Sequence, residues 1–96
     1  MKFIIVDASQ YAYEESKISP EYIDKLKDKY KLETVKVNKY NKELEYTIIT
    51  IDNIVSLVEL QKLVGKFVIG LDLYYLPEEI ESIIDSTIVI YDDYIE

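Results

Sequence analysis

The sequence contains no cysteine, no histidine and no arginine, and it has only two glycines and two prolines. Without cysteine, the chain forms neither a disulfide nor a thiolate metal site. Histidine is the commonest general base and the commonest metal ligand, so its absence excludes the Ser–His and Cys–His arrangements of nucleophilic catalysis. Because glycine and proline are so few, we expect most of the 96 residues to lie in regular helices and strands.

Sequence motifs for nucleotide and calcium binding are also missing. Gly65 and Gly70 stand alone, so there is no phosphate-binding loop and no dinucleotide-binding turn. Asp92 and Asp93 lack the alternating ligands and the central glycine of an EF-hand loop. We therefore predict that the protein is not an enzyme and that it uses no cofactor.

The length and the hydrophobic content favour a single domain over residues 1–96. Hydrophobic residues make up 49% of the chain, which is enough to build one core. The apolar run at residues 3–6 is too short for a signal peptide and is followed by Asp7. No run approaches the roughly 20 apolar residues of a membrane-spanning helix. We expect a cytoplasmic protein that does not bind membranes.

The N-terminal third predicts a strand, a loop and a helix. Residues 3–6 are continuously apolar, as is typical of a strand that is buried on both faces. Residues 8–19 show neither the helical nor the strand periodicity of apolar residues and are interpreted as a loop with at most one turn of helix. Ser19 can cap a helix and Pro20 suits its first position, and apolar residues then recur at helical spacing to about Tyr30.

The middle of the chain predicts a hairpin followed by a helix. Apolar and polar residues alternate over residues 35–38 and 44–48, on either side of a polar turn in which Asn41 tolerates a left-handed backbone. Asp52 is the expected cap of the next helix, which ends at Gly65. Apolar residues cover most of the circumference of this helix, so we expect it to be deeply packed.

The C-terminal part predicts a strand at residues 67–73, a short helix at 77–85 and a strand at 87–91. The helix is expected to turn three residues inward, namely Ile80, Ile83 and Ile84. The complete order predicts an α+β fold with an antiparallel sheet of four or five strands and helices on one face. The first six elements follow the ferredoxin-like β-α-β-β-α-β order, and the last helix and strand extend it.

The net charge of −8 is concentrated in the last third of the chain. Residues 1–66 hold eleven lysines and eleven acids, whereas residues 67–96 hold eight acids and no base. Such a region attracts basic surfaces and repels nucleic acid, and the tyrosines among the acids are typical of interfaces. The predicted partner-binding residues are Asp72, Tyr74, Tyr75, Glu78, Glu79, Glu81, Asp85, Asp92, Asp93, Tyr94 and Glu96. The alternative is that these acids only solvate an apolar segment.

The stretch IVIYDDYIE at residues 88–96, together with the acidic, tyrosine-rich and cysteine-free composition, resembles small acidic proteins of phages and mobile elements from AT-rich Gram-positive bacteria. Some of these proteins, including several anti-CRISPR proteins, inhibit host nucleases by placing carboxylates where the nuclease binds phosphates. The resemblance implies an inhibitor in the host cytoplasm. Its partner would be a basic, nucleic-acid-binding host protein such as a CRISPR nuclease.

Two other functions are compatible with the sequence. One is a self-associating structural or accessory phage domain, in which the apolar second helix and the tyrosine-rich strands form a homodimer across a two-fold axis. The other is a metal-dependent phosphodiesterase. In that case carboxylates at strand ends would hold a magnesium ion. A strand that ends in an aspartate within a ferredoxin-like order also resembles the small CRISPR-associated nucleases, although a basic face for duplex DNA is missing. The carboxylates concerned are Asp7, Asp72, Asp92 and Asp93.

Overall fold

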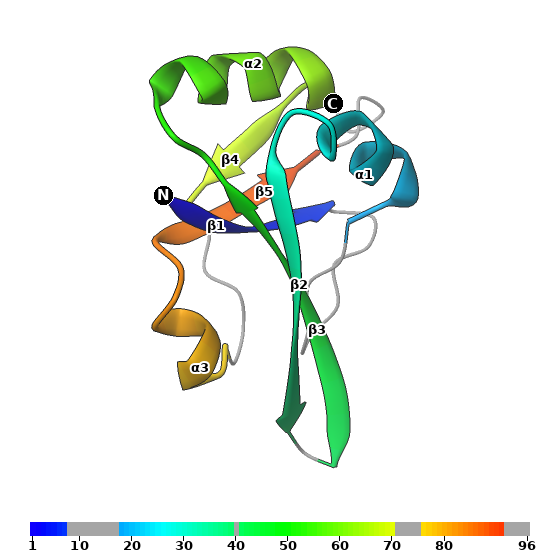
Figure 1. Cartoon of the computed structure of the whole chain (residues 1–96), viewed down its shortest axis with the longest axis vertical. Helices are drawn as coiled ribbons and strands as arrows, with labels where there is room; N and C mark the ends of the chain where they lie inside the picture. The colour runs from blue at the N-terminus through cyan, green and yellow to red at the C-terminus, as the bar shows by residue number, and fades with distance from the viewer. Residues whose placement is uncertain (8–17, 40, 71–75, 92–96) are drawn as a thin grey trace.

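A computed structural model of the chain describes residues 1–7, 18–39, 41–70 and 76–91. The elements in chain order are β1 (Lys2–Asp7), α1 (Pro20–Leu26), β2 (Lys31–Lys39), β3 (Lys42–Thr50), α2 (Ile54–Val64), β4 (Phe67–Ile69), α3 (Glu78–Glu81) and β5 (Ser86–Ile90). The five strands form one sheet in the order β2-β3-β1-β5-β4 (Figure 1). The predicted α+β class is therefore confirmed.

The sheet is mixed, so the prediction of a purely antiparallel sheet is wrong. The central strand β1 pairs antiparallel with β3 and parallel with β5, and β4 pairs antiparallel with β5 at the edge. The reason lies in burial: β5 is buried from Thr87 to Ile90, whereas Val68 and Ile69 of β4 are 41% and 47% exposed. A strand that is apolar on both faces is stable only in the interior of a sheet. Hence β5 lies between β1 and β4 and does not extend a ferredoxin-like sheet at its edge.

Helices cover both faces of the sheet, which corrects the expectation of helices on one face. Phe3 and Ile5 of β1 belong to a core that includes residues of α1 and α2. Ile4 lies in a second core with Ile48 of β3 and Ile80 of α3. Because successive side chains of a strand point to opposite faces, α2 and α3 must lie on opposite sides of β1, as Figure 1 shows.

The helix α1 begins where the sequence predicts it but is shorter. Ser19 occupies the N-cap position, yet its hydroxyl makes no capping hydrogen bond and donates instead to the carboxylate of Asp7. The helix ends at Leu26 instead of continuing to about Tyr30. The hydroxyl of Tyr30 donates to the carbonyl of Ser56 at 2.7 Å and so connects this region with α2.

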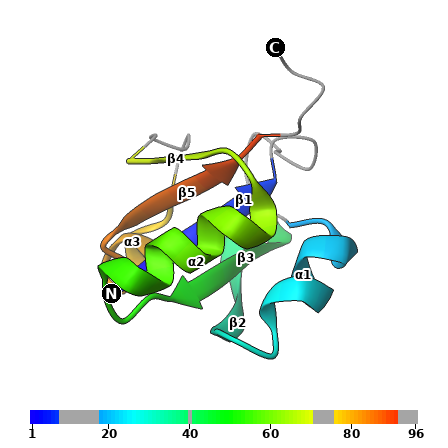
Figure 2. The same cartoon turned by 90° about the horizontal axis from the view of Figure 1, so that it is seen from above.

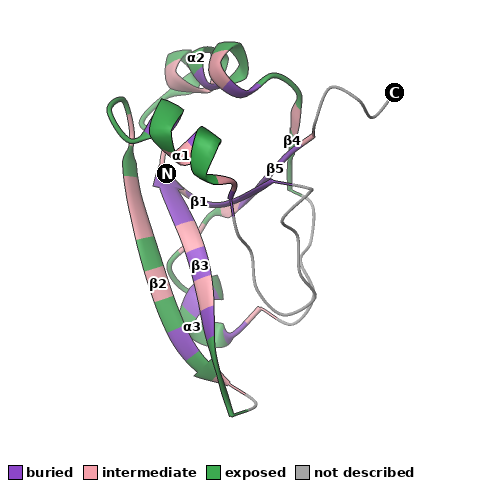
Figure 3. Ribbon diagram, turned by 90° about the vertical axis from the view of Figure 1, so that its right-hand side faces the viewer, coloured by how far each residue is buried: buried purple, intermediate pink, exposed green. Residues whose placement is uncertain are grey.

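The predicted hairpin is confirmed. The strands β2 and β3 pair antiparallel along their whole length, from Lys31 opposite Thr50 to Lys39 opposite Lys42. Asn41 has a φ of 60°, the left-handed conformation that the turn requires. Along β3, buried residues alternate with less buried ones from Leu44 to Ile48, whereas Val37 is the only buried residue of β2 (Figure 3).

The helix α2 has the predicted C-terminus but neither the predicted cap nor the predicted burial. The Asn53 side chain, not that of Asp52, accepts a hydrogen bond from the Ser56 N–H at 3.0 Å. Gly65 ends the helix with a φ of 79°, as expected. Only Leu60 and Val64 are buried in α2. The exposed apolar residues are Ile54 (74%), Val55 (62%) and Val58 (51%). The prediction of deep packing is wrong because only one side of the helix contacts the sheet.

The last elements are also shorter than the sequence suggests. The strand β4 ends at Ile69 and is followed by Gly70 with a φ of 90°, while residues 71–73 of the predicted strand lie outside the described ranges. The short helix α3 ends at Glu81, and Ile83, which was expected to point inward, is 41% exposed. Within the described ranges, no helix has the length and apolar character needed to cross a membrane.

Candidate functional site: the acidic surface of α3

The three glutamates of α3 are held outward by one buried residue. Ile80 is fully buried and packs into the core that contains Ile4 and Ile48. On a helix this short, turning Ile80 towards the sheet directs its neighbours to solvent, and Glu78, Glu79 and Glu81 are all exposed. Here we call these three residues the acidic surface of α3.

The acidic surface of α3 lies around a shallow, open depression that is lined by its three glutamates and Ser82. The Ser82 hydroxyl donates to the backbone carbonyl of Glu79 at 3.1 Å and not to a glutamate carboxylate. Among the described residues, no hydrogen bond or ion pair engages the side chains of Glu78, Glu79 and Glu81. The three negative charges are therefore available to a partner.

Several acids elsewhere in the chain are compensated by neighbouring lysines. The Lys36 ammonium lies 3.7 Å from Glu43 and 3.8 Å from Glu45 on the hairpin. On α1, the Asp24 carboxylate lies 3.4 Å from the ammonium of Lys27. Since residues 67–96 contain no base, the acidic surface of α3 has no such local compensation from its own segment.

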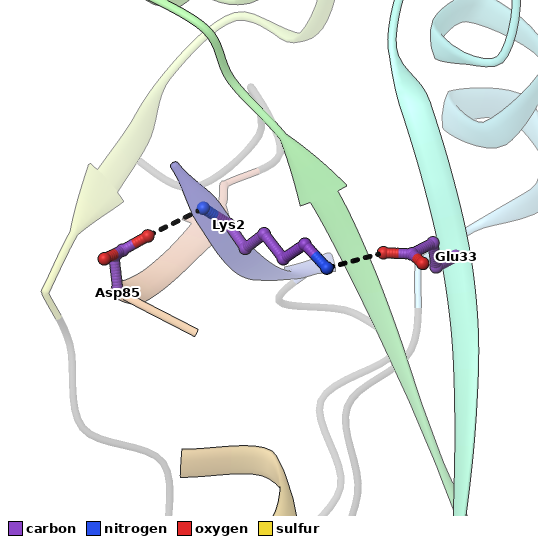
Figure 4. Close-up of polar contacts among 3 residues, drawn as sticks. All are labelled: Lys2, Glu33 and Asp85. Atoms are coloured by element: carbon purple, nitrogen blue, oxygen red, sulfur yellow. Dashed lines mark hydrogen bonds and ion pairs between the residues drawn. The ribbon is translucent and has the colours of Figure 1, made fainter. Parts of the chain in front are cut away.

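Asp85, a further predicted site residue, has a structural role, because it is hydrogen-bonded to the backbone of β1. Its carboxylate accepts a hydrogen bond from the Lys2 backbone N–H at 2.8 Å, and the Lys2 ammonium lies 3.5 Å from Glu33 on β2 (Figure 4). The Asp85 N–H donates in turn to the Lys2 carbonyl at 2.7 Å. The structure thus separates Asp85, which joins two strands, from the three glutamates, which face solvent. The predicted site residues outside the described ranges are Asp72, Tyr74, Tyr75, Asp92, Asp93, Tyr94 and Glu96.

The carboxylate considered for a metal site, Asp7, is 1% exposed and accepts the hydrogen bond from Ser19. Because β1 and β5 are parallel, Asp7 lies beside Ile90 at the carboxyl edge of both strands. In the parts of the chain that the structure describes, no three acidic side chains come together in a way that would hold a metal ion. The other three carboxylates of this hypothesis lie outside those parts.

One apolar surface was expected only under the alternative of a self-associating domain, and the edge strand that belongs to it was not predicted from the sequence. The outer side of α2 and the edge strand β4 expose the apolar residues Ile54, Val55, Val58, Val68 and Ile69. The signal was present, because α2 is apolar around most of its circumference. Periodicity alone, however, does not show which side of such a helix is buried.

Comparisons of the chain with protein-family models, with curated proteins and with solved structures gave no match.

Proposed function

We propose that this protein is a non-enzymatic binding domain that docks on a basic partner protein through the acidic surface of α3. The observation that carries the proposal is the exposure, on one four-residue helix, of three carboxylates that have no ion-pair partner among the described residues. Charges that are not compensated locally produce a field of one sign, and such a field accelerates association with an oppositely charged surface by about 10- to 1000-fold.

The class of partner is inferred from the sign of the charge. Nucleic acid is repelled by a negative surface, whereas a protein that binds nucleic acid carries the lysines and arginines that carboxylates attract. A host nuclease is one such partner, which would make this protein an inhibitor that competes with the phosphate backbone. Affinity beyond the steering effect requires buried contacts next to the charges, and tyrosines are frequent in such positions.

The first experiment locates the basic-binding surface with a defined probe, a fluorescent oligolysine peptide. Neutralising the acidic surface of α3 by the triple change Glu78→Gln, Glu79→Gln and Glu81→Gln should weaken binding by at least about 10-fold at low ionic strength. The matched control neutralises three exposed acids of α1 and the turn that follows it, where lysines lie among the acids. The control changes are Glu21→Gln, Asp24→Asn and Asp28→Asn.

Both triple variants raise the net charge by the same amount, so only the position of the charges differs between them. We expect the α1 variant to retain most of the binding, as measured by fluorescence anisotropy. A second measurement compares the proteins that the two variants capture from a bacterial lysate treated with nuclease. If the α3 variant binds the peptide as the wild type does, the acidic surface is only a solvated face and the proposal is wrong.

A further inference from the structure

The two edges of the sheet differ in how they are protected from pairing. Edge strands present unpaired backbone groups, and charged side chains are a usual means of preventing association there. The outer strand β2 carries several of them, namely Lys31, Glu33, Lys36 and Lys39. The strand at the other edge, β4, consists of Phe67, Val68 and Ile69 and contains neither a charge nor a proline.

The hydrogen bonds of β4 show which of its backbone groups face outward. The Lys66 carbonyl accepts from the Tyr91 N–H at 3.0 Å, and the Gly70 N–H donates to the Thr87 carbonyl at 2.9 Å. In an antiparallel pair the direction alternates along the strand, so the groups of Val68 also point to β5. The N–H and C=O groups of Phe67 and Ile69 therefore point away from the sheet, and the described residues supply no partner for them.

Apolar side chains continue from this edge onto α2. Phe67 packs against the core beneath α2, and Ile69 lies on the same face of β4 because it is two residues further on. On α2, the Ser56 carbonyl accepts the hydrogen bond from Tyr30 near α1, and Ile54 and Val58, each two residues from Ser56, lie on the opposite flank of the helix. Figure 2 shows α2 between α1 and β4, so this flank looks towards β4.

We propose that β4 pairs antiparallel with β4 of a second copy of this chain, which forms a homodimer with a sheet that is continuous across both copies. If Phe67 of one copy lies opposite Ile69 of the other, the outward N–H and C=O groups of both residues are satisfied by the same groups of the second copy. The two-fold axis then passes between the two Val68 residues. The interface is isologous, since the same strand serves both sides and the pairing closes.

The distribution of charge favours a second copy at this edge. Two molecules with a net charge of −8 repel each other, so they can associate only where the surface is not acidic. Residues 53–70 hold a single acid, Glu59, and two lysines, Lys62 and Lys66. The side chains of β4 from both copies would form an apolar floor between the two α2 helices. The acidic surface of α3 lies on the opposite face of the sheet and remains open to a basic partner.

The test is the mass of the protein in solution as a function of concentration, measured by analytical ultracentrifugation. We expect a wild-type dimer that dissociates on dilution. Ile69→Lys should raise the dissociation constant by at least about 10-fold. Ile69→Pro removes only an outward N–H, so it should do the same without breaking the β4–β5 ladder. The matched control is Ile83→Lys, at a residue with similar exposure on the far side of the sheet, and it should remain dimeric.

A second measurement reads the pairing at single amides. By NMR hydrogen exchange, the Phe67 and Ile69 amides should become protected as the protein concentration rises, whereas the Val68 amide is protected at all concentrations. Circular dichroism verifies that each variant is folded. A wild type that stays monomeric at millimolar concentration would overturn the proposal, and so would a dimer that both Ile69 variants retain. Pairing of the edge with another protein would give protection that is independent of the concentration of this chain, which also contradicts the homodimer.

Discussion

Lys2 and Asp85 are joined by hydrogen bonds in both directions. The Lys2 N–H donates to the Asp85 carboxylate at 2.8 Å, and the Asp85 N–H donates to the Lys2 carbonyl at 2.7 Å. Lys2 and Asp85 each come directly before the first pair of the parallel register, in which Phe3 lies beside Ser86. This contact therefore aligns the starts of β1 and β5, the two strands at the centre of the fold.

Removing this carboxylate should lower the stability of the fold. Asp85→Ala deletes the acceptor of the Lys2 N–H, and we expect a loss of about 1 kcal/mol in urea unfolding. Asp85→Asn should lose less, because an amide oxygen still accepts. Glu81→Ala, at an exposed glutamate that has no ion-pair partner within the described ranges, serves as the control and should stay within about 0.5 kcal/mol of the wild type. Equal losses for Asp85→Ala and Glu81→Ala would show that the contact contributes nothing.

The cap of α2 allows a comparison of two adjacent residues. Asn53→Ala removes the side-chain acceptor of the Ser56 N–H and should cost about 1 kcal/mol, the usual contribution of an N-cap. Asp52→Ala should be nearly neutral, since Asp52 is exposed and does not occupy the cap position. Thermal unfolding followed by circular dichroism distinguishes the two variants. A larger loss of stability for Asp52→Ala would show that Asp52, the residue expected from the sequence, caps the helix.

The two sides of α2 should respond differently to truncation. Leu60 is fully buried, so Leu60→Ala leaves a cavity and should cost about 2–5 kcal/mol. Val58 is 51% exposed, and Val58→Ala should change the stability of the monomer by less than about 0.5 kcal/mol. Urea unfolding at low protein concentration measures both without a contribution from self-association. A neutral Leu60→Ala would place α2 differently on the sheet.

The phenol of Tyr30 should contribute to stability through its hydrogen bond to Ser56. Tyr30→Phe keeps the ring and removes the hydroxyl, and we expect a loss of about 0.5–1.5 kcal/mol at neutral pH. The variant Tyr91→Phe, at a second partly buried tyrosine, is the control. A Tyr30→Phe protein as stable as the wild type would indicate that water replaces the hydrogen bond.

The same phenol should make stability depend on pH in the alkaline range. Burial raises the pKa of Tyr30 above its ordinary value of 10.0, and the nearby Glu59 carboxylate raises the pKa further. The folded state thus binds the proton more tightly than the unfolded state. The resulting stability is fully present below pH 10 and is lost as the pH rises through the pKa of the folded state.

Other tyrosines and lysines also titrate at high pH, so the informative quantity is the difference between wild type and Tyr30→Phe. This difference should shrink as the pH is raised from about 9 to about 11.5. Glu59→Gln should move the decline to lower pH, because it removes the second cause of the raised pKa. A difference that stays constant over this range would contradict the raised pKa.

Elements that depend on neighbouring residues were predictable from the sequence. The hairpin with Asn41 in a left-handed turn and the helix end at Gly65 both follow from local backbone preferences. The position of β5 beside β1 was not predictable, since it depends on a pairing between residues 83 apart in the chain, as at Lys2 and Asp85. The position of α3 on the other face of the sheet was not predictable for the same reason, because it also depends on contacts between residues far apart in the chain.

The candidate site, like the fold, was predictable from the sequence only in part. The concentration of acids after residue 66 is visible in the sequence, but the sequence does not separate Asp85, whose carboxylate accepts a backbone hydrogen bond, from Glu78 and Glu79, which face solvent. That separation depends on the tertiary contact with Lys2. The apolar edge at β4 was missed for a similar reason, because only the strand order shows that its outward groups have no neighbour within the described residues.

The parallel pairing of β1 with β5 also affects how the chain folds during synthesis. The central strand β1 leaves the ribosome well before β5, which is made about eighty residues later, as the spacing of Lys2 and Asp85 shows. Until then one edge of an almost wholly apolar strand stays unpaired, a state that favours aggregation. The high sequence separation of the central contacts also predicts slow folding for a chain of this length. Nascent chains that stop before Ser86 should therefore remain bound to chaperones, whereas chains that include β5 should be released.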